Sequence, residues 1–166
     1  ANSKTCIEKE LALKTSLSAK RYLSQMGYRV ILTRTKDVFV PLRQRASTAN
    51  KTNGQLFVSL HFNAAKNPKA SGIEVFYYNS RSTWRRNSSR RLATQVLGRL
   101  LSATGAPSRG VKVGNFHVIR ETKMPSILVE GGFITHPGEQ QRLLDPAYID
   151  RIGRAVAEGV DKYFRP

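Results

Sequence analysis

The sequence predicts a single α/β domain, in which helices cover both faces of a mixed, mostly parallel β-sheet. Three observations lead to this fold class. Apolar runs of strand length alternate along the chain with amphipathic stretches of helix length. The 166 residues are enough for one domain with one sizeable core. No linker, internal repeat or low-complexity tract divides them, so residues 1–166 are treated as one domain.

The first half of the chain is expected to form two helices and two strands. A helix that opens in the stretch 5–13 and runs to about residue 27 is predicted by apolar residues at helical spacing, namely Ile7, Leu11, Tyr22 and Met26. The run "YRVILTRT" (28–35) is continuous and β-rich, which suits a buried strand. A helical stretch, "VPLRQRASTANK" (40–51), then precedes a second buried strand, "GQLFVSLHFNA" (54–64).

The second half continues the alternation. "GIEVFYYN" (72–79) alternates like a strand, and a helix at about 84–104 carries one apolar stripe, made of Ala93, Val96, Leu97, Leu100 and Leu101. "VGNFHVIR" (113–120) and "PSILVEGGF" (125–133) are two further strand candidates. The final helix, at 146–164, turns a second apolar set inward, made of Ile149, Ile152, Val156 and Val160.

The charge of the chain indicates acidic partners. The net charge is +17, and from residue 38 to residue 120 there are fourteen Lys and Arg residues but one acid, Glu74. Nucleic acid, an anionic membrane surface and an anionic cell-wall polymer all fit this imbalance. Nucleic-acid binding would call for aromatic residues among the basic ones, and only Trp84 is so placed, so no nucleic acid is expected. No apolar run is long enough to span a membrane.

The single cysteine, Cys6, allows no internal disulfide and no thiolate metal cluster, and it is interpreted as a small buried residue. The segment "RSTWRRNSSRR" (81–91) is interpreted as the basic start of a helix near a substrate groove.

Polar side chains stand where two of the expected strands end. In the strand at 54–64, Ser59, His61 and Asn63 share one face and follow one another toward its carboxyl end. The strand at 125–133 reaches Glu130, and two glycines follow that leave room for another molecule near the backbone. Ligands of open α/β sheets bind outside the carboxyl ends of strands, so His61 and Glu130 lie where chemistry is usually placed.

A third polar residue, Glu8, falls in the apolar arc of the first helix. A single His or Glu at a strand end is most often structural, but three such placements together need each other or a cation to offset desolvation. A divalent metal held by a carboxylate and an imidazole, with a second carboxylate as general base, accounts for Glu8, His61 and Glu130. Zinc suits nitrogen and oxygen ligands best.

Catalytic zinc normally takes three protein ligands, and the sequence nominates two. His117, in "GNFHVIR", could line the same cleft, whereas His136, in "FITHPGE", is interpreted as a solvated loop residue.

Several of these segments resemble one known family. The segments "GYRVILTR", "LRQRASTAN", "FVSLHFNA", "GIEVFYYN", "RGVKVGNFHVIRETKMPSILVEGGFI" and "YIDRIGRAVAEGVDKYF" together are similar to the zinc-dependent N-acetylmuramoyl-L-alanine amidases with an amidase-3 type catalytic domain. The resemblance runs from about Glu8 to the C-terminus, and "S-x-H-x-N" and "MPSILVEGGF" are its most specific motifs. It implies a six-stranded mixed sheet and hydrolysis of the amide between N-acetylmuramic acid and L-alanine.

The resemblance also implies roles for individual residues. Glu8 matches a zinc-binding Glu of an "E-K" pair, His61 matches a zinc-binding His, and Glu130 matches the catalytic base. Asn63 could bind substrate, or it could be a structural turn amide. The implied partners are peptidoglycan and anionic wall polymers, the implied location is the bacterial cell envelope, and a monomer is expected.

Two departures from the family pattern are expected to matter. A first strand and a "GHGG" motif, with a third zinc ligand, should precede Glu8, and residues 1–7 contain neither, so the catalytic domain is expected to be N-terminally incomplete. A catalytically inactive relative that binds peptidoglycan or a partner protein therefore stays open as the alternative function. The 68 residues between His61 and Glu130 are filled by a strand, a helix and a strand, which indicates a domain without the inserted inhibitory helix of some members.

Overall fold

The computed structural model describes residues 7–166. Its sheet has four strands, β1 (Phe57–Asn63), β2 (Ile73–Tyr77), β3 (Ser108–Val113) and β4 (Ser126–Phe133), in the order β1-β4-β2-β3. β1 pairs with β4 and β2 pairs with β3 in parallel, whereas β2 and β4 are antiparallel. The sheet is therefore mixed, as predicted, although the described residues supply four of the six strands that the family resemblance implies.

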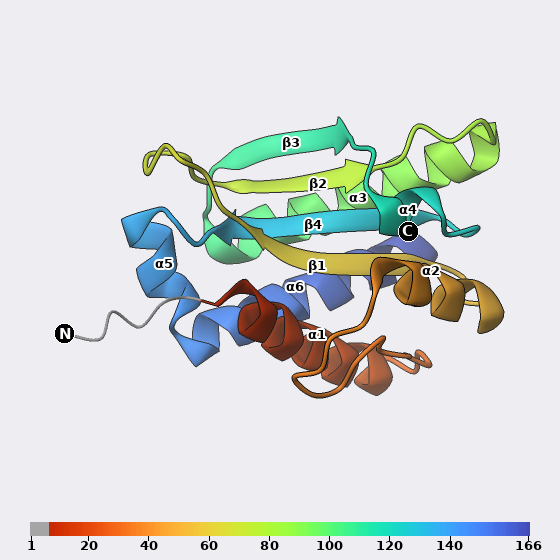
Figure 1. Ribbon diagram of the computed structural model, residues 1–166, viewed down its shortest axis with the longest axis horizontal. Coiled ribbons are helices and arrows are strands. Elements are labelled where there is room, and N and C mark those ends of the chain that lie inside the picture. Colours follow the sequence, from red (N-terminus) through yellow and green to blue (C-terminus); the bar gives the residue numbers. More distant parts are fainter. Residues whose placement is uncertain (1–6) are drawn as a thin grey trace.

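Helices cover both faces of this sheet (Figure 1). One face packs against α1 (Glu8–Gln25), α3 (Thr83–Thr104) and α6 (Pro146–Phe164) and forms the main core, whose fully buried members include Ile73, Leu92, Leu100, Ile127 and Ile152. The other face carries α2 (Leu42–Lys51) and the short α4 (His117–Arg120), where Val118 and Ile119 pack on Leu128. α5 (Pro137–Leu143) follows β4.

Local signals explain where the long helices begin and end. The side chain of Ser82 accepts a hydrogen bond from the backbone N–H of Arg85 and caps α3, which ends at Gly105 in the left-handed conformation. Asp145 caps α6 in the same way, followed by proline in the first turn. None of the described helices is both long enough and apolar enough to cross a membrane.

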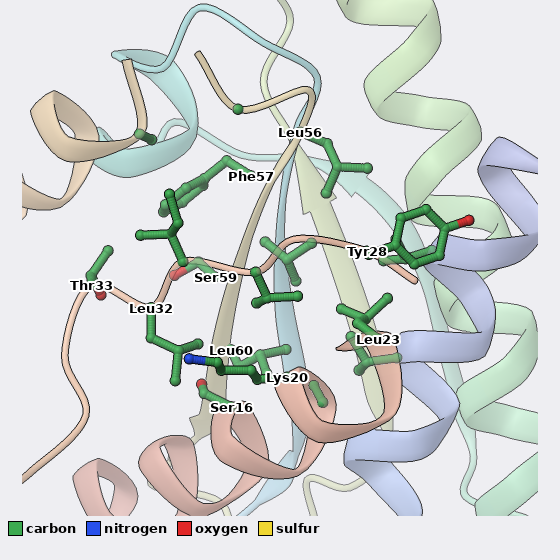
Figure 2. Close-up of a pocket in the computed structure, with 18 of the residues that line it drawn as sticks. Ser16, Lys20, Leu23, Tyr28, Leu32, Thr33, Leu56, Phe57, Ser59 and Leu60 are labelled. Carbon is green, nitrogen blue, oxygen red and sulfur yellow. The ribbon is translucent and has the colours of Figure 1, made fainter. Parts of the chain in front are cut away.

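The prediction of a strand at 28–35 is wrong, because these residues form neither a strand nor a helix. These residues lie beside α1 and β1, but no backbone hydrogen bond joins residues 29–35 to β1 or to any other described strand. A strand is defined by its hydrogen-bonded neighbours, and residues 29–35 have none among residues 7–166. The groove between it and β1 has a volume of about 270 Å³. Figure 2 shows Leu23 of α1, Tyr28 and Leu60 of β1 around it.

The expected strand at 113–120 is also wrong. β3 begins earlier, at Ser108, and ends at Val113, and residues 117–120 form α4. The apolar alternation around His117 reflects one helical turn, in which Val118 and Ile119 are both buried against the sheet. The remaining expected elements match observed ones within three residues at each end.

Candidate functional site

A row of ionisable side chains crosses one end of the sheet. His61 on β1 and Glu74 on β2 are both register partners of Glu130 on β4. Register partners point to the same face of a sheet, so the three side chains lie side by side on the face that α4 covers only in part. This is the end at which β1 and β4 finish, as predicted for His61 and Glu130, and Glu8 at the start of α1 lies beside it (Figure 1).

Glu8 and His61 contact each other directly. The Oε1 atom of Glu8 is 2.8 Å from the Nδ1 atom of His61, and the Nε2 atom of His61 is 3.0 Å from the hydroxyl of Ser59. The hydrogen bond from His61 holds the pKa of Glu8 below its usual value, and it outweighs the effect of partial burial. The side chain of Glu8 is 43% exposed, so it lies at the rim of the apolar face rather than within it. Its position in the first helical turn explains this exposure.

Glu130 is the most strongly perturbed acid of the site. Burial raises its pKa to about 7, His61 opposes that rise, and the charges of Glu8 and Glu74 add to it. Its Oε2 atom is buried and accepts no hydrogen bond within the described part of the chain. A carboxylate with this pKa can both accept and release a proton near neutral pH.

The glycines after Glu130 do not leave an open space. A Cβ atom on Gly131 would come within 2.8 Å of the ring of Phe62, and one on Gly132 would come within 3.3 Å of the carboxylate of Glu139. The expectation that they admit another molecule is therefore wrong, because side chains of the same chain fill the room. The buried Glu139 accepts hydrogen bonds from the backbone N–H groups of Phe133 and Gly72, and so holds the ends of two strands together.

Both the nitrogen and the oxygen of the Asn63 side-chain amide form hydrogen bonds within the chain. Its Nδ2 atom donates to Glu74 at 3.0 Å, and its Oδ1 atom accepts from the backbone N–H of Ala64 at 2.9 Å. A β-bulge between His61 and Asn63 brings the amide toward β2. These two hydrogen bonds make Asn63 a structural turn amide that also orients Glu74.

Sequence reasoning missed Glu74 as a member of the site. It is 4% exposed, and its Oε2 atom accepts from Arg109 at 3.2 Å and from Lys112 at 2.6 Å. One signal could have identified it, because Glu74 is the one acid among fourteen basic residues from 38 to 120, and it stands on a strand.

The two spare histidines lie elsewhere. His117 begins α4, where its Nε2 atom is buried and has no partner among the described residues. His136 is the N-cap of α5, and its Nδ1 atom accepts from the backbone N–H of Glu139, so it is a capping residue rather than a freely solvated one.

Two other expected features fall outside the row. The basic segment 81–91 starts α3 beyond Tyr77, whose register partner Ile127 stands at the start of β4, so this segment lies at the opposite end of the sheet from Glu130. Cys6 lies outside the described residues.

Glu8 and His61 are the two side chains of the site that could bind a metal ion. Glu8 and His61 offer a carboxylate and an imidazole that already share one proton at 2.8 Å, and an ion would replace that proton. Within residues 7–166, no cluster of three or more His, Cys, Asp or Glu side chains is arranged to hold a metal. The chemistry of the two donors therefore fits a zinc ion, while the ligand count within the described residues is short of three.

Comparison with known proteins identifies relatives of this chain and of its fold. Residues 1–162 match the family model described as N-acetylmuramoyl-L-alanine amidase. The chain is 34% identical over 159 residues to the N-acetylmuramoyl-L-alanine amidase LytC of Bacillus subtilis (strain 168), an alignment that covers 96% of this chain and 32% of LytC. The chain thus spans about a third of the length of that relative.

Solved structures agree with the sequence relatives. The N-acetylmuramoyl-L-alanine amidase from Clostridium difficile 630 superposes with a TM-score of 0.89 at 35% identity, covering 95% of this chain and 84% of that one. The amidase AmiC2 of Nostoc punctiforme gives a TM-score of 0.89 at 34% identity, covering 96% and 85%. The mixed sheet, its helical layers and the sequence identity lead to the same conclusion: this chain belongs to the N-acetylmuramoyl-L-alanine amidase family with an amidase-3 type catalytic domain.

Proposed function

We propose that this chain is the catalytic part of a peptidoglycan hydrolase that cleaves the amide between N-acetylmuramic acid and L-alanine. The observation that carries the proposal is Glu130, a carboxylate with a pKa of about 7 that stands in register with His61 next to Glu8. Family membership supplies the substrate class, and the row of side chains supplies groups suited to hydrolysis.

Glu8 and His61 would hold a zinc ion in this proposal. When bound, zinc polarises a carbonyl and lowers the pKa of a coordinated water to about 7. The lowered pKa of Glu8 keeps its carboxylate ionised, as a ligand must be. Glu8 and His61 come from α1 and β1, which pack directly against each other, so the fold holds the two donors together.

Glu130 acts as the general base and then as the general acid. Its Oε2 atom, which has no hydrogen-bond partner within residues 7–166, can take a proton from the attacking water and pass it to the leaving nitrogen of L-alanine. Burial makes this carboxylate basic enough for the first transfer, and a pKa of about 7 still allows release. Asn63 takes a supporting role through Glu74, and contact of its amide with substrate stays a proposal.

The net charge of +17 suits a cell-wall substrate with carboxylates and associated anionic polymers. A Staphylococcus aureus relative that is 28% identical is named a probable cell wall amidase. We place this chain by analogy in the bacterial cell envelope, acting as a monomer.

Hydrolysis can be tested with Glu130→Gln. We expect the zinc-loaded wild-type protein to release new L-alanine amino groups from purified peptidoglycan, and we expect Glu130→Gln to release none. Metal analysis should find zinc in both proteins. Glu121→Gln, which removes an exposed acid at the C-terminal end of α4, is the matched control and should hydrolyse normally. Activity retained in Glu130→Gln would refute the general base.

The inactive relative that binds peptidoglycan is the second candidate, and the relatives named as amidases favour hydrolysis over it. Wild-type protein that takes up no zinc at near-neutral pH, yet sediments with peptidoglycan, would reverse that order.

A further inference from the structure

Two cations at the β3 edge are held against a single buried carboxylate. The Oε2 atom of Glu74 accepts from both the Nε atom of Arg109 and the Nζ atom of Lys112. The side chains of Arg109 and Lys112 are 36% and 42% exposed, so one side of each faces solvent. One carboxylate and two cations leave one positive charge in excess at this position.

The excess charge is preorganised. The guanidinium of Arg109 lies over the ring of Phe133, 5.0 Å from its centroid, and it also donates to the backbone carbonyl of Ser71. Lys112 uses one of its three donors on Glu74 within the described residues. Donors that are fixed in place and only partly used bind an anion at a lower entropic cost than free surface lysines do.

The pair stands at a defined place in the row. Glu74 is the register partner of Glu130 on β4 and of Gly110 on β3. Lys112 lies two residues after Gly110 and therefore points to the same face of the sheet. Neighbouring strands are about 4.8 Å apart, so the backbone of β3 lies roughly 10 Å from that of β4. Both cations reach back from β3 to the carboxylate of Glu74, the neighbour of Glu130 on β2.

We propose that Arg109 and Lys112 form a subsite for a carboxylate on the peptide side of the substrate, two residues beyond the scissile amide. Two extended residues span about 7 Å, and a charge-assisted hydrogen bond adds about 2.8 Å, which together cover the roughly 10 Å between the backbones of β4 and β3. In N-acetylmuramoyl peptides this position is the α-carboxylate of D-isoglutamate. The inference rests on the proposed function, since that function places the scissile amide at Glu130.

A matched pair of ligands tests the subsite. N-acetylmuramoyl-L-alanyl-D-isoglutamate carries the carboxylate, and N-acetylmuramoyl-L-alanyl-D-isoglutamine carries an amide in its place. Calorimetric titration into Glu130→Gln, chosen so that neither ligand is cleaved, should give about fivefold to tenfold tighter binding of the acid at low salt, as expected for a charge-assisted contact.

Variants separate the subsite from a structural role of the cations. In the Glu130→Gln background, Lys112→Gln should lower the affinity for the acid ligand to that for the amide ligand. It should change the affinity for the amide ligand by less than twofold. Arg109→Gln serves as the second variant if Lys112→Gln does not fold. Lys162→Gln removes one positive charge from an exposed site on α6 and should keep the preference for the acid.

Equal affinity for the two ligands, no binding of either, or an equal loss of both in Lys112→Gln would each overturn the subsite. Failure of the proposed function looks different. If zinc-loaded wild type releases no amino groups from peptidoglycan but still binds the acid ligand more tightly, the proposed hydrolase function is refuted and the carboxylate subsite is supported. If peptidoglycan is hydrolysed without a preference for the acid, only the subsite falls.

Discussion

Glu74 on β2 and Glu130 on β4 face each other directly across an antiparallel strand pair. The two carboxylates differ in their partners, because Glu74 is paired with Arg109 and Lys112 whereas the Oε2 atom of Glu130 has none among the described residues. One carboxylate of the pair is therefore matched by two cations, whereas burial raises the pKa of the other, Glu130, to about 7. Environments that differ in this way are the usual means by which neighbouring carboxylates take different roles.

The raised pKa of Glu130 should make the stability of the metal-free chain depend on pH. Its folded pKa of about 7 exceeds its ordinary value of 4.5, so the folded chain holds this proton more tightly than the unfolded chain does. The free energy of unfolding should therefore fall as pH rises from about 4.5 to about 7, by about 3 kcal/mol, and this contribution is constant above pH 7. Urea denaturation in EDTA across this range measures it.

Glu130→Gln isolates this contribution, since glutamine does not titrate. The variant should be more stable than the metal-free wild type at pH 8, and the difference should shrink as pH falls toward 4.5. A difference that does not vary with pH would show that Glu130 titrates normally.

Removal of Glu74 should lower the pKa of Glu130. Glu74→Gln deletes a like charge that raises this pKa, and it leaves Arg109 and Lys112 without their carboxylate, which favours the ionised form of Glu130 further. NMR titration of the Glu130 carboxyl carbon in metal-free protein should show the downward shift. Glu158→Gln, on the surface of α6, is the control and should leave the Glu130 titration in place.

Zinc affinity should depend on Glu8 and not on its neighbour Glu10. Glu8→Gln removes a proposed ligand, and the loss should exceed the roughly 10–100-fold that outer-shell changes cause at metal sites. Glu10 lies in the same helical turn but is exposed and has no role in the site, so Glu10→Gln should bind zinc like the wild type. Competition with a chromophoric chelator gives both constants. Equal affinity of the two variants would remove Glu8 from the ligand set.

Gly159 should be required for the packing of α6 against α3. A Cβ atom at this position would lie 2.5 Å from the Cα atom of Val96, which is backbone and cannot rotate away. Gly159→Ala should therefore destabilise the fold by about 1–3 kcal/mol through overpacking. Gly98→Ala, on the exposed side of α3 with nothing within 4 Å, should instead stabilise by roughly 1 kcal/mol because alanine favours helix. Chemical denaturation of both variants checks the opposite signs.

The unpaired segment at 29–34 should exchange its amide hydrogens quickly. Its backbone N–H groups have no strand partner among the described residues, whereas residues 127–129 of β4 are paired on both sides. Native-state hydrogen exchange should give little protection for 29–34 and protection close to global unfolding for 127–129. Comparable protection of the two segments would mean that 29–34 pairs with a strand in solution.

Local patterns were sufficient for most of the fold and for part of the site. The helices at 8–25, 42–51, 83–104 and 146–164 and three of the four strands follow from the spacing of apolar residues. The alternation along β1 also places His61 on a defined face, and Glu130 interrupts the buried run of β4 three residues before that strand ends. These properties depend on residues close in sequence, so they can be predicted without knowing what packs against them.

Tertiary structure alone decided the rest, because strand pairing and register join residues far apart in the chain. The run at 28–35 has the composition of a strand but pairs with no strand of the described residues, and 113–120 is divided between the end of β3 and α4. Register also placed Glu74 beside Glu130 and put Arg109 and Lys112 at the far end of the row. The sequence by itself thus determined which polar residues stand at strand ends, and the folded sheet decided which of them are neighbours and how their charges shift one another's pKa values.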